Sequence, residues 1–120
     1  MGQMVRSVLV IDDHAGFRSG ARMVLERGEF EVVGEAVDAA SGLLAATRLR
    51  PDVVLLDVVL PDSDGFAVLD RLLADPTPPA VVLVSTRDAS DYGDRVARSG
   101  AKGFIQKARL SASAMDALLG

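Results

Sequence analysis

The chain has 120 residues, 49% of them hydrophobic, and no cysteine. This length suits one domain with a core of its own, and the lack of thiols excludes disulfides and cysteine chemistry. A net charge of −4 argues against a general nucleic-acid surface. The sequence shows neither an apolar run of membrane-spanning length nor a signal-peptide pattern. We therefore expect a single cytoplasmic domain over residues 1–120 that binds neither nucleic acid nor membrane directly.

Apolar runs alternate with amphipathic stretches in the first half of the chain. Residues 7–12 form an apolar run that ends in carboxylates and predict a strand, and residues 14–27 predict a helix from their three- and four-residue apolar spacing. Residues 30–36 predict an outer strand. Residues 38–50 predict an Ala/Leu-rich helix that ends before a proline. Residues 52–57 are apolar on both faces, which is typical of a central parallel strand.

The same alternation continues in the second half of the chain. Residues 66–74 predict a helix, and residues 80–85 predict a strand that is apolar on both faces. Residues 91–99 predict a short helix that a glycine weakens, and residues 101–107 predict the fifth strand. Residues 111–119 predict a final helix capped by a serine. The whole pattern indicates an α/β fold: a doubly wound five-stranded parallel sheet of order 2-1-3-4-5 with helices on both faces.

Polar side chains gather where the predicted strands end. These residues are Asp12 and Asp13 after the first strand, Asp57 after the third, Ser85 after the fourth and Lys107 after the fifth. Parallel strands bring these ends to one edge of the sheet, beside the crevice at the switch point. Three carboxylates there would raise one another's pKa unless a cation lies among them, and an oxygen-only ligand set suits Mg²⁺. A carboxylate in such a site can attack a phosphoryl group, whose oxygens a lysine and a hydroxyl would bind.

Four motifs in combination resemble a known family. They are Val-Ile-Asp12-Asp13, Leu-Leu-Asp57-Val-Val-Leu-Pro61-x-x-x-Gly65, Val-Ser85-Thr86 and Gly103-Phe104-Ile-Gln-Lys107. The sequence resembles the receiver domains of two-component response regulators, over essentially its whole length. The Asp-Asp-His14 opening is similar to the receivers of helix-turn-helix regulators. The resemblance implies the flavodoxin-like receiver fold.

The resemblance also implies a phosphoacceptor. Asp57 would take a phosphoryl group from the phosphohistidine of a histidine kinase or histidine phosphotransfer protein. Asp12 and Asp13 would hold Mg²⁺ together with the Asp57 carboxylate and the backbone carbonyl of Val59. The chain would act as a signalling switch rather than an enzyme, with only its own autophosphorylation and slow autodephosphorylation.

The remaining family positions imply a switch and an output surface. Ser85 and Lys107 would bind the phosphoryl group, and the ring of Phe104 would turn inward when Ser85 moves toward it. A phosphoryl group adds charge and acceptor oxygens, which motivates that movement. The fourth helix, fifth strand and fifth helix would form the output face, with Tyr92 and Arg95 on it. That face would bind a downstream protein or form a homodimer.

Three positions depart from the family pattern, and His14 stands apart from it. Ala108 replaces the usual proline after Lys107, and Thr86 replaces a smaller residue. Val59 is apolar where many members carry a polar side chain, so it cannot orient an attacking water. We expect Thr86 and Val59 to make the aspartyl phosphate long-lived. His14, the single histidine, is interpreted as a polar residue at the mouth of the first helix.

Three arrangements of this function stay open. We expect a stand-alone receiver, because Met1-Gly-Gln directly precedes the first strand and no linker follows the last helix before Gly120. The first alternative is the isolated receiver half of a DNA-binding transcription regulator. The second is a receiver-like scaffold that binds a partner without phosphorylation, which the presence of the whole site constellation argues against.

Overall fold

Five parallel strands form one sheet in residues 5–120, the part of the chain that this computed structural model describes. The strands are β1 (Arg6–Ile11), β2 (Phe30–Ala36), β3 (Val53–Asp57), β4 (Ala80–Ser85) and β5 (Gly103–Gln106). Their order is β2-β1-β3-β4-β5 and every neighbouring pair is parallel, which confirms the predicted topology. The expectation built on residues 1–3 lies outside the described residues.

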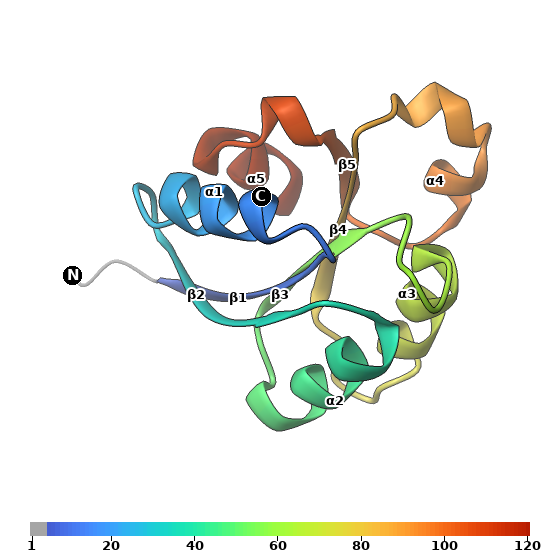
Figure 1. Ribbon diagram of the computed structural model, residues 1–120, viewed down its shortest axis with the longest axis horizontal. Coiled ribbons are helices and arrows are strands. Elements are labelled where there is room, and N and C mark those ends of the chain that lie inside the picture. Colours follow the sequence, from blue (N-terminus) through green and yellow to red (C-terminus); the bar gives the residue numbers. More distant parts are fainter. Residues whose placement is uncertain (1–4) are drawn as a thin grey trace.

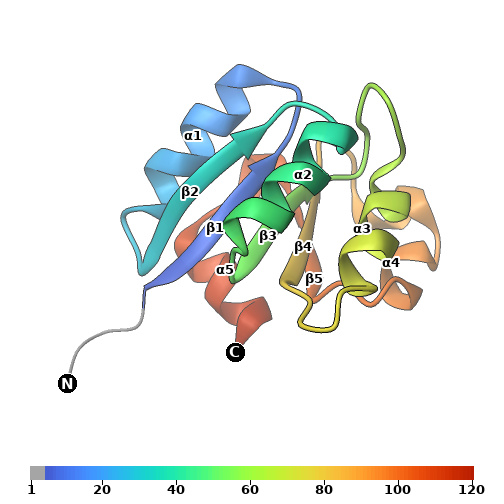
Figure 2. The ribbon, with the colours of Figure 1, turned by 90° about the horizontal axis from the view of Figure 1, so that it is seen from below.

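Helices cover both faces of this sheet (Figures 1 and 2). The helices are α1 (Ala15–Leu25), α2 (Ala39–Leu49), α3 (Gly65–Leu73), α4 (Arg95–Arg98) and α5 (Ala112–Leu119). Helices α1 and α5 lie on one face, and α2, α3 and α4 lie on the other. Within residues 5–120 the longest helices have eleven residues, too few to cross a membrane.

The central strands supply most of the core. The side chains of Leu9 and Ile11 face α2 and α3, whereas those of Val8 and Val10, which alternate with them, face α1 and α5. All four are fully buried, as are the corresponding positions of β3. This two-sided burial follows from parallel strands covered on both faces, and it explains the unbroken apolar runs of the sequence.

Polar caps fix where several helices begin. The side chain of Asp38 accepts a hydrogen bond from the backbone N–H of Ser41 at the start of α2, and Ser111 caps α5 as predicted. Asp64 caps α3 by accepting from the backbone of its first turn. Arg50 follows the last residue of helix α2 and takes a left-handed conformation with φ 46° directly before Pro51.

Two predicted boundaries are wrong. The expected helix over residues 91–99 is instead a 3₁₀ turn, η1 (Ala89–Tyr92), followed by the four-residue α4. Gly93 lies between them at φ 61°, a conformation outside the α region, so the helix cannot continue through it. Strand β5 ends at Gln106, and Lys107 begins the 3₁₀ turn η2 (Lys107–Arg109) rather than ending the strand.

Gly65 shows where the loop after β3 is too crowded for a side chain. A Cβ atom there would lie 2.3 Å from the carbonyl oxygen of Asp57 and 2.7 Å from the Cα of Val58, both of them backbone atoms. We predict that Gly65→Ala lowers the free energy of unfolding by about 2 kcal/mol or more. Gly20→Ala is the control, because its Cβ meets open space in α1 and should stabilise by about 0.5–1 kcal/mol. Urea unfolding of both variants measures this, and equal effects would contradict the steric argument.

Candidate functional site

The predicted site residues meet at the carboxyl edge of the sheet. Asp57 and Ser85 are the last residues of β3 and β4, whereas Asp12 and Lys107 directly follow β1 and β5. A hollow of about 310 Å³ is lined by Asp57, Ser85, Lys107 and Asp13. Val59 and Thr86 also line it, and Asp12 lies fully buried beneath it. The sheet order therefore brings together every strand-end residue that the sequence singled out.

The ammonium of Lys107 joins two of the carboxylates. Its Nζ lies 2.5 Å from Oδ2 of Asp12 and 3.0 Å from Oδ2 of Asp57. The side chain is only 9% exposed and passes over the ring of Phe17, with Nζ 4.6 Å from the ring centroid. Burial alone would lower the pKa of Lys107, but the hydrogen bonds and charges of the two aspartates raise it above its usual value. The lysine is thus held as a cation inside the site.

Asp57 is a buried carboxylate with both oxygens engaged. Oδ1 accepts a hydrogen bond from the backbone N–H of Val59 at 3.0 Å, and Oδ2 faces Lys107. Burial is the main cause that raises the pKa of Asp57, and the charge of Asp12 adds to it. The hydrogen bond from Val59 and the contact with Lys107 oppose this rise. Removal from water, more than the predicted repulsion among carboxylates, therefore dominates the electrostatics of Asp57.

An acidic cluster at the same edge fits a divalent cation. Carboxylate oxygens of Asp12, Asp13 and Asp57 and a ring nitrogen of His14 lie within 4.8 Å of one another. Oδ2 of Asp12 is buried and, within residues 5–120, makes no hydrogen bond of regular geometry, although the charge of Lys107 lies close to it. The metal fit therefore rests on the cluster as a whole rather than on this one oxygen, and its oxygen-rich set suits Mg²⁺.

His14 is more closely involved than the sequence suggested. Its backbone N–H donates to Oδ1 of Asp12 at 2.8 Å, and its Nδ1 lies 3.3 Å from the same oxygen and 3.2 Å from Asp13. The side chain is 68% exposed. The two-residue spacing from Asp12 is the signal that could have revealed the turn, because aspartates often accept from the backbone two residues on.

Ser85 is engaged on the side of the site toward η1. Its Oγ lies 2.7 Å from the hydroxyl of Tyr92 and accepts the backbone N–H of Arg87 at 3.1 Å. The ring of Tyr92 lies 6.0 Å from the rings of both Phe66 and Phe104. Sequence reasoning placed Tyr92 on a surface and missed this contact, because it depends on the irregular path of residues 86–92.

The loop after Asp57 is attached to helices on two sides. The Asp62 carboxylate accepts the backbone N–H groups of Ala39 and Ala40 at the start of α2, and these hydrogen bonds lower its pKa. Asp64 pairs with Arg95 of α4 at 2.9 Å. Burial would raise the pKa of Asp64, but the hydrogen bonds it accepts, that from Arg95 foremost, lower it.

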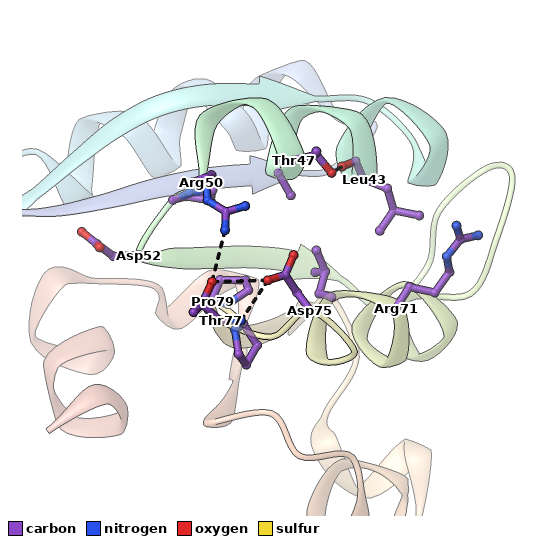
Figure 3. Close-up of a pocket in the computed structure, with 12 residues that line it drawn as sticks. Leu43, Thr47, Arg50, Asp52, Arg71, Asp75, Thr77 and Pro79 are labelled. Atoms are coloured by element: carbon purple, nitrogen blue, oxygen red, sulfur yellow. Dashed lines mark hydrogen bonds between the residues drawn. The ribbon is translucent and has the colours of Figure 1, made fainter.

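A larger hollow, of about 420 Å³, lies at the opposite end of the sheet between α2, α3 and the start of β4. Figure 3 shows the side chain of Arg50 directed toward Thr77, to which it donates at 3.2 Å. The two carboxylates of this hollow are already engaged, Asp52 by Ser7 and Asp75 by Thr77. Its acids are thus used for local structure, and the chemistry belongs to the smaller hollow.

The raised pKa of Asp57 predicts an unusual stability effect. A group whose pKa is raised by folding stabilises the protein below its unfolded pKa and loses that stabilisation as the pH rises through its folded pKa. Asp57→Asn should therefore raise the free energy of unfolding at pH 7 without divalent metal, on the order of 1 kcal/mol, and Lys107 would keep Asp12 as its partner.

This advantage should shrink as the pH falls toward 3.8, the ordinary pKa of the carboxyl group. Urea unfolding of both proteins at pH 7 and pH 4 in the presence of a chelator measures it. A variant less stable than wild type at pH 7 would mean that the ion pair with Lys107 outweighs the burial cost.

Comparisons with known proteins agree with this geometry. A sequence model of the response regulator receiver domain matches residues 8–118. The transcriptional regulatory protein LiaR of Bacillus subtilis is 33% identical over 116 residues, covering 96% of this chain and 54% of LiaR. The DNA-binding transcriptional activator EvgA of Escherichia coli K12 is 30% identical over 101 residues, covering 84% of this chain and 50% of EvgA. The chain spans about half the length of the curated relatives it matches.

Solved structures show the same fold at similar identity. The signal receiver domain of NarL from Mycobacterium tuberculosis superposes with a TM-score of 0.85 at 32% identity, covering 98% of this chain and 99% of that one. A LuxR-family two-component response regulator from Aurantimonas has a TM-score of 0.84 at 25% identity, covering 96% and 85%. The chain therefore belongs to the response regulator receiver domain family of two-component signalling, a family of signalling phosphoacceptors rather than classical enzymes.

Proposed function

We propose that Asp57 accepts a phosphoryl group from the phosphohistidine of a histidine kinase or histidine phosphotransfer protein. The observation that carries this proposal is the buried ammonium of Lys107 beside the carboxylates of Asp57 and Asp12 at the open edge of the sheet. A histidine kinase is the general partner of the family. That such a kinase or a phosphotransfer protein acts on this chain is part of the proposal.

In the proposed step a carboxylate oxygen of Asp57 attacks phosphorus. The new O–P bond forms as the N–P bond of the phosphohistidine breaks, and the imidazole leaves with the electron pair of that bond. Lys107 is placed to bind a phosphoryl oxygen once the carboxylate carries the group, because its Nζ already lies 3.0 Å from Oδ2. Ser85, at the end of the neighbouring strand, supplies a hydroxyl for a second oxygen after its side chain turns. Slow hydrolysis of the acyl phosphate would return the site to its starting state.

Asp12, Asp13, the Asp57 carboxylate and the backbone carbonyl of Val59 would hold Mg²⁺. The acidic cluster is typical of the receiver metal site, and the assignment of individual ligands is our proposal. When bound, the ion neutralises charge on the phosphoryl oxygens. Val59 suits this role because its backbone N–H donates a hydrogen bond to Asp57, which holds the residue beside that carboxylate.

The output of the proposed switch lies on α4, β5 and α5. Ser85 and Phe104 would change position on phosphorylation, and Tyr92 and Arg95 lie in the segment that would respond. A downstream protein partner, or a second copy of the chain, would bind this face, and no direct contact with nucleic acid is proposed for it. A cytoplasmic location belongs to the same proposal.

A stand-alone role stays a prediction, because curated relatives carry this domain within chains about twice as long. EvgA is a DNA-binding transcriptional activator, and this likeness favours the alternative that the chain is the receiver half of a DNA-binding transcription regulator. The phosphoacceptor chemistry is the same in both arrangements. A scaffold that is never phosphorylated is the competing function, and the next experiment separates it from the others.

The chemistry predicts a mass change. Incubation with acetyl phosphate and Mg²⁺ should add one phosphoryl group per chain, measured by intact-mass spectrometry. The addition should be lost in Asp57→Asn and reduced at least about tenfold in Lys107→Ala, which removes the cation facing the phosphoryl oxygens. Folded wild type that gains no mass from acetyl phosphate or from a cognate kinase would leave the scaffold as the better function.

Two residues at the mouth of the hollow predict a long-lived phosphate. Val59 is 61% exposed and lines the site with Thr86, so neither a small nor a water-orienting side chain stands there. We predict that Thr86→Ala and Val59→Asn each speed the loss of the phosphoryl group by several-fold, followed by the decay of phosphoprotein mass over time. A rate of phosphoryl loss that is unchanged or slower in both variants would contradict this prediction.

A further inference from the structure

The hydroxyl of Ser85 is engaged by groups other than Asp57. Within the described residues its hydrogen bonds go to Tyr92 and to the backbone N–H of Arg87, and none goes to Asp57. Ser85 is 2% exposed, so no water competes freely for these positions. Contact with a phosphoryl group on Asp57 therefore requires the Ser85 side chain to rotate away from Tyr92.

Tyr92 belongs to the least buried part of the chain. None of residues 86–102 is buried, in contrast to β4 directly before them. No fully buried side chain attaches this segment to the body. Tyr92 contacts Ser85, Phe66 and Phe104, Arg95 contacts Asp64 and the ring of Phe66, and Val96 packs partly buried against the core. A segment with so few buried contacts opens at low free-energy cost, so the loss of one contact changes its population of open forms.

We propose that Tyr92 is a positioning residue that holds the Ser85 hydroxyl away from Asp57 and releases the η1–α4 segment when Ser85 turns to the phosphoryl group. This inference rests on the proposed function of Asp57 and Ser85. In this proposal the contact between the Ser85 and Tyr92 hydroxyls both restrains Ser85 and connects the site with the output face.

The contact differs from the switch expected at Phe104. Phe104 carries no hydroxyl, and its ring meets that of Tyr92 at 6.0 Å. Tyr92 stands against Phe104 on one side and Phe66 on the other, so a displaced Tyr92 also changes the surroundings of Phe104. In this proposal the hydrogen bond between Tyr92 and Ser85 breaks first, and Phe104 moves afterwards because its packing against Tyr92 has changed.

Tyr92→Phe tests the proposal because it removes only the hydroxyl and keeps the aromatic contacts. Beryllofluoride with Mg²⁺ serves as the phosphoryl mimic, and its affinity is measured by isothermal titration. Loss of one restraining hydrogen bond should tighten binding about two- to tenfold. In a Ser85→Ala background the same substitution should give no tightening, since the restrained hydroxyl is absent.

Hydrogen exchange supplies the second readout. Beryllofluoride should speed the exchange of amides 89–98 in wild type, and Tyr92→Phe should show faster exchange there before any ligand is added. Val96→Ala is the matched control: Val96 is a partly buried residue of α4 that packs against the α2–α3 side of the core. It should loosen the same segment without tightening beryllofluoride binding.

The outcomes separate the two proposals. Wild type that binds no beryllofluoride and gains no phosphoryl mass overturns the function, and the role of Tyr92 with it. Normal phosphorylation with equal affinity in Tyr92→Phe overturns the role of Tyr92 alone. Equal tightening in Val96→Ala or in the Ser85→Ala background also overturns it, because general loosening would then explain the effect.

Discussion

The contact of Lys107 with Asp12 and Asp57 is the interaction on which the site depends. Two buried carboxylates so close together lower the stability of the fold unless a cation compensates their charge. The ammonium of Lys107, which follows β5, is that cation. The three residues come from the ends of β1, β3 and β5, which meet only because the order is β2-β1-β3-β4-β5. The topology is thus a condition of the charge balance, and a strand out of place would leave an acid unpaired.

The loop between Asp57 and α3 connects the site with the neighbouring helices. Gly65 lies so near the Asp57 carbonyl that no side chain fits, and its N–H donates to the carbonyl of Val58. Asp62 attaches the loop to α2, and Asp64 attaches it to α4 through Arg95. One short loop therefore connects Asp57 with α2 and α4, and the contact of Ser85 with Tyr92 connects the site with η1, directly before α4.

The sequence predicted the sheet and the strand-end residues well because both depend on local patterns. An unbroken apolar run predicts a strand buried on two faces, and a carboxylate after it marks the edge. The helix over residues 91–99 was wrong because its broken path depends on the positive φ of Gly93. The contacts of Ser85 with Tyr92 and of Asp62 with α2 have no periodic signature, since they join irregular segments whose path only the folded chain defines.

The division between rigid and weakly held parts follows from burial. Residues 8–11 and 53–56 are at most 1% exposed, so the positions of Asp12 and Asp57 are set by a core that cannot shift without large cost. Residues 86–102 contribute no fully buried side chain; contacts at Tyr92 and Arg95 and the partly buried side chain of Val96 hold them. The phosphoryl group proposed at Asp57 would therefore move the carboxylates little, and we expect the response in the segment that follows Ser85, which is held by the fewest buried contacts.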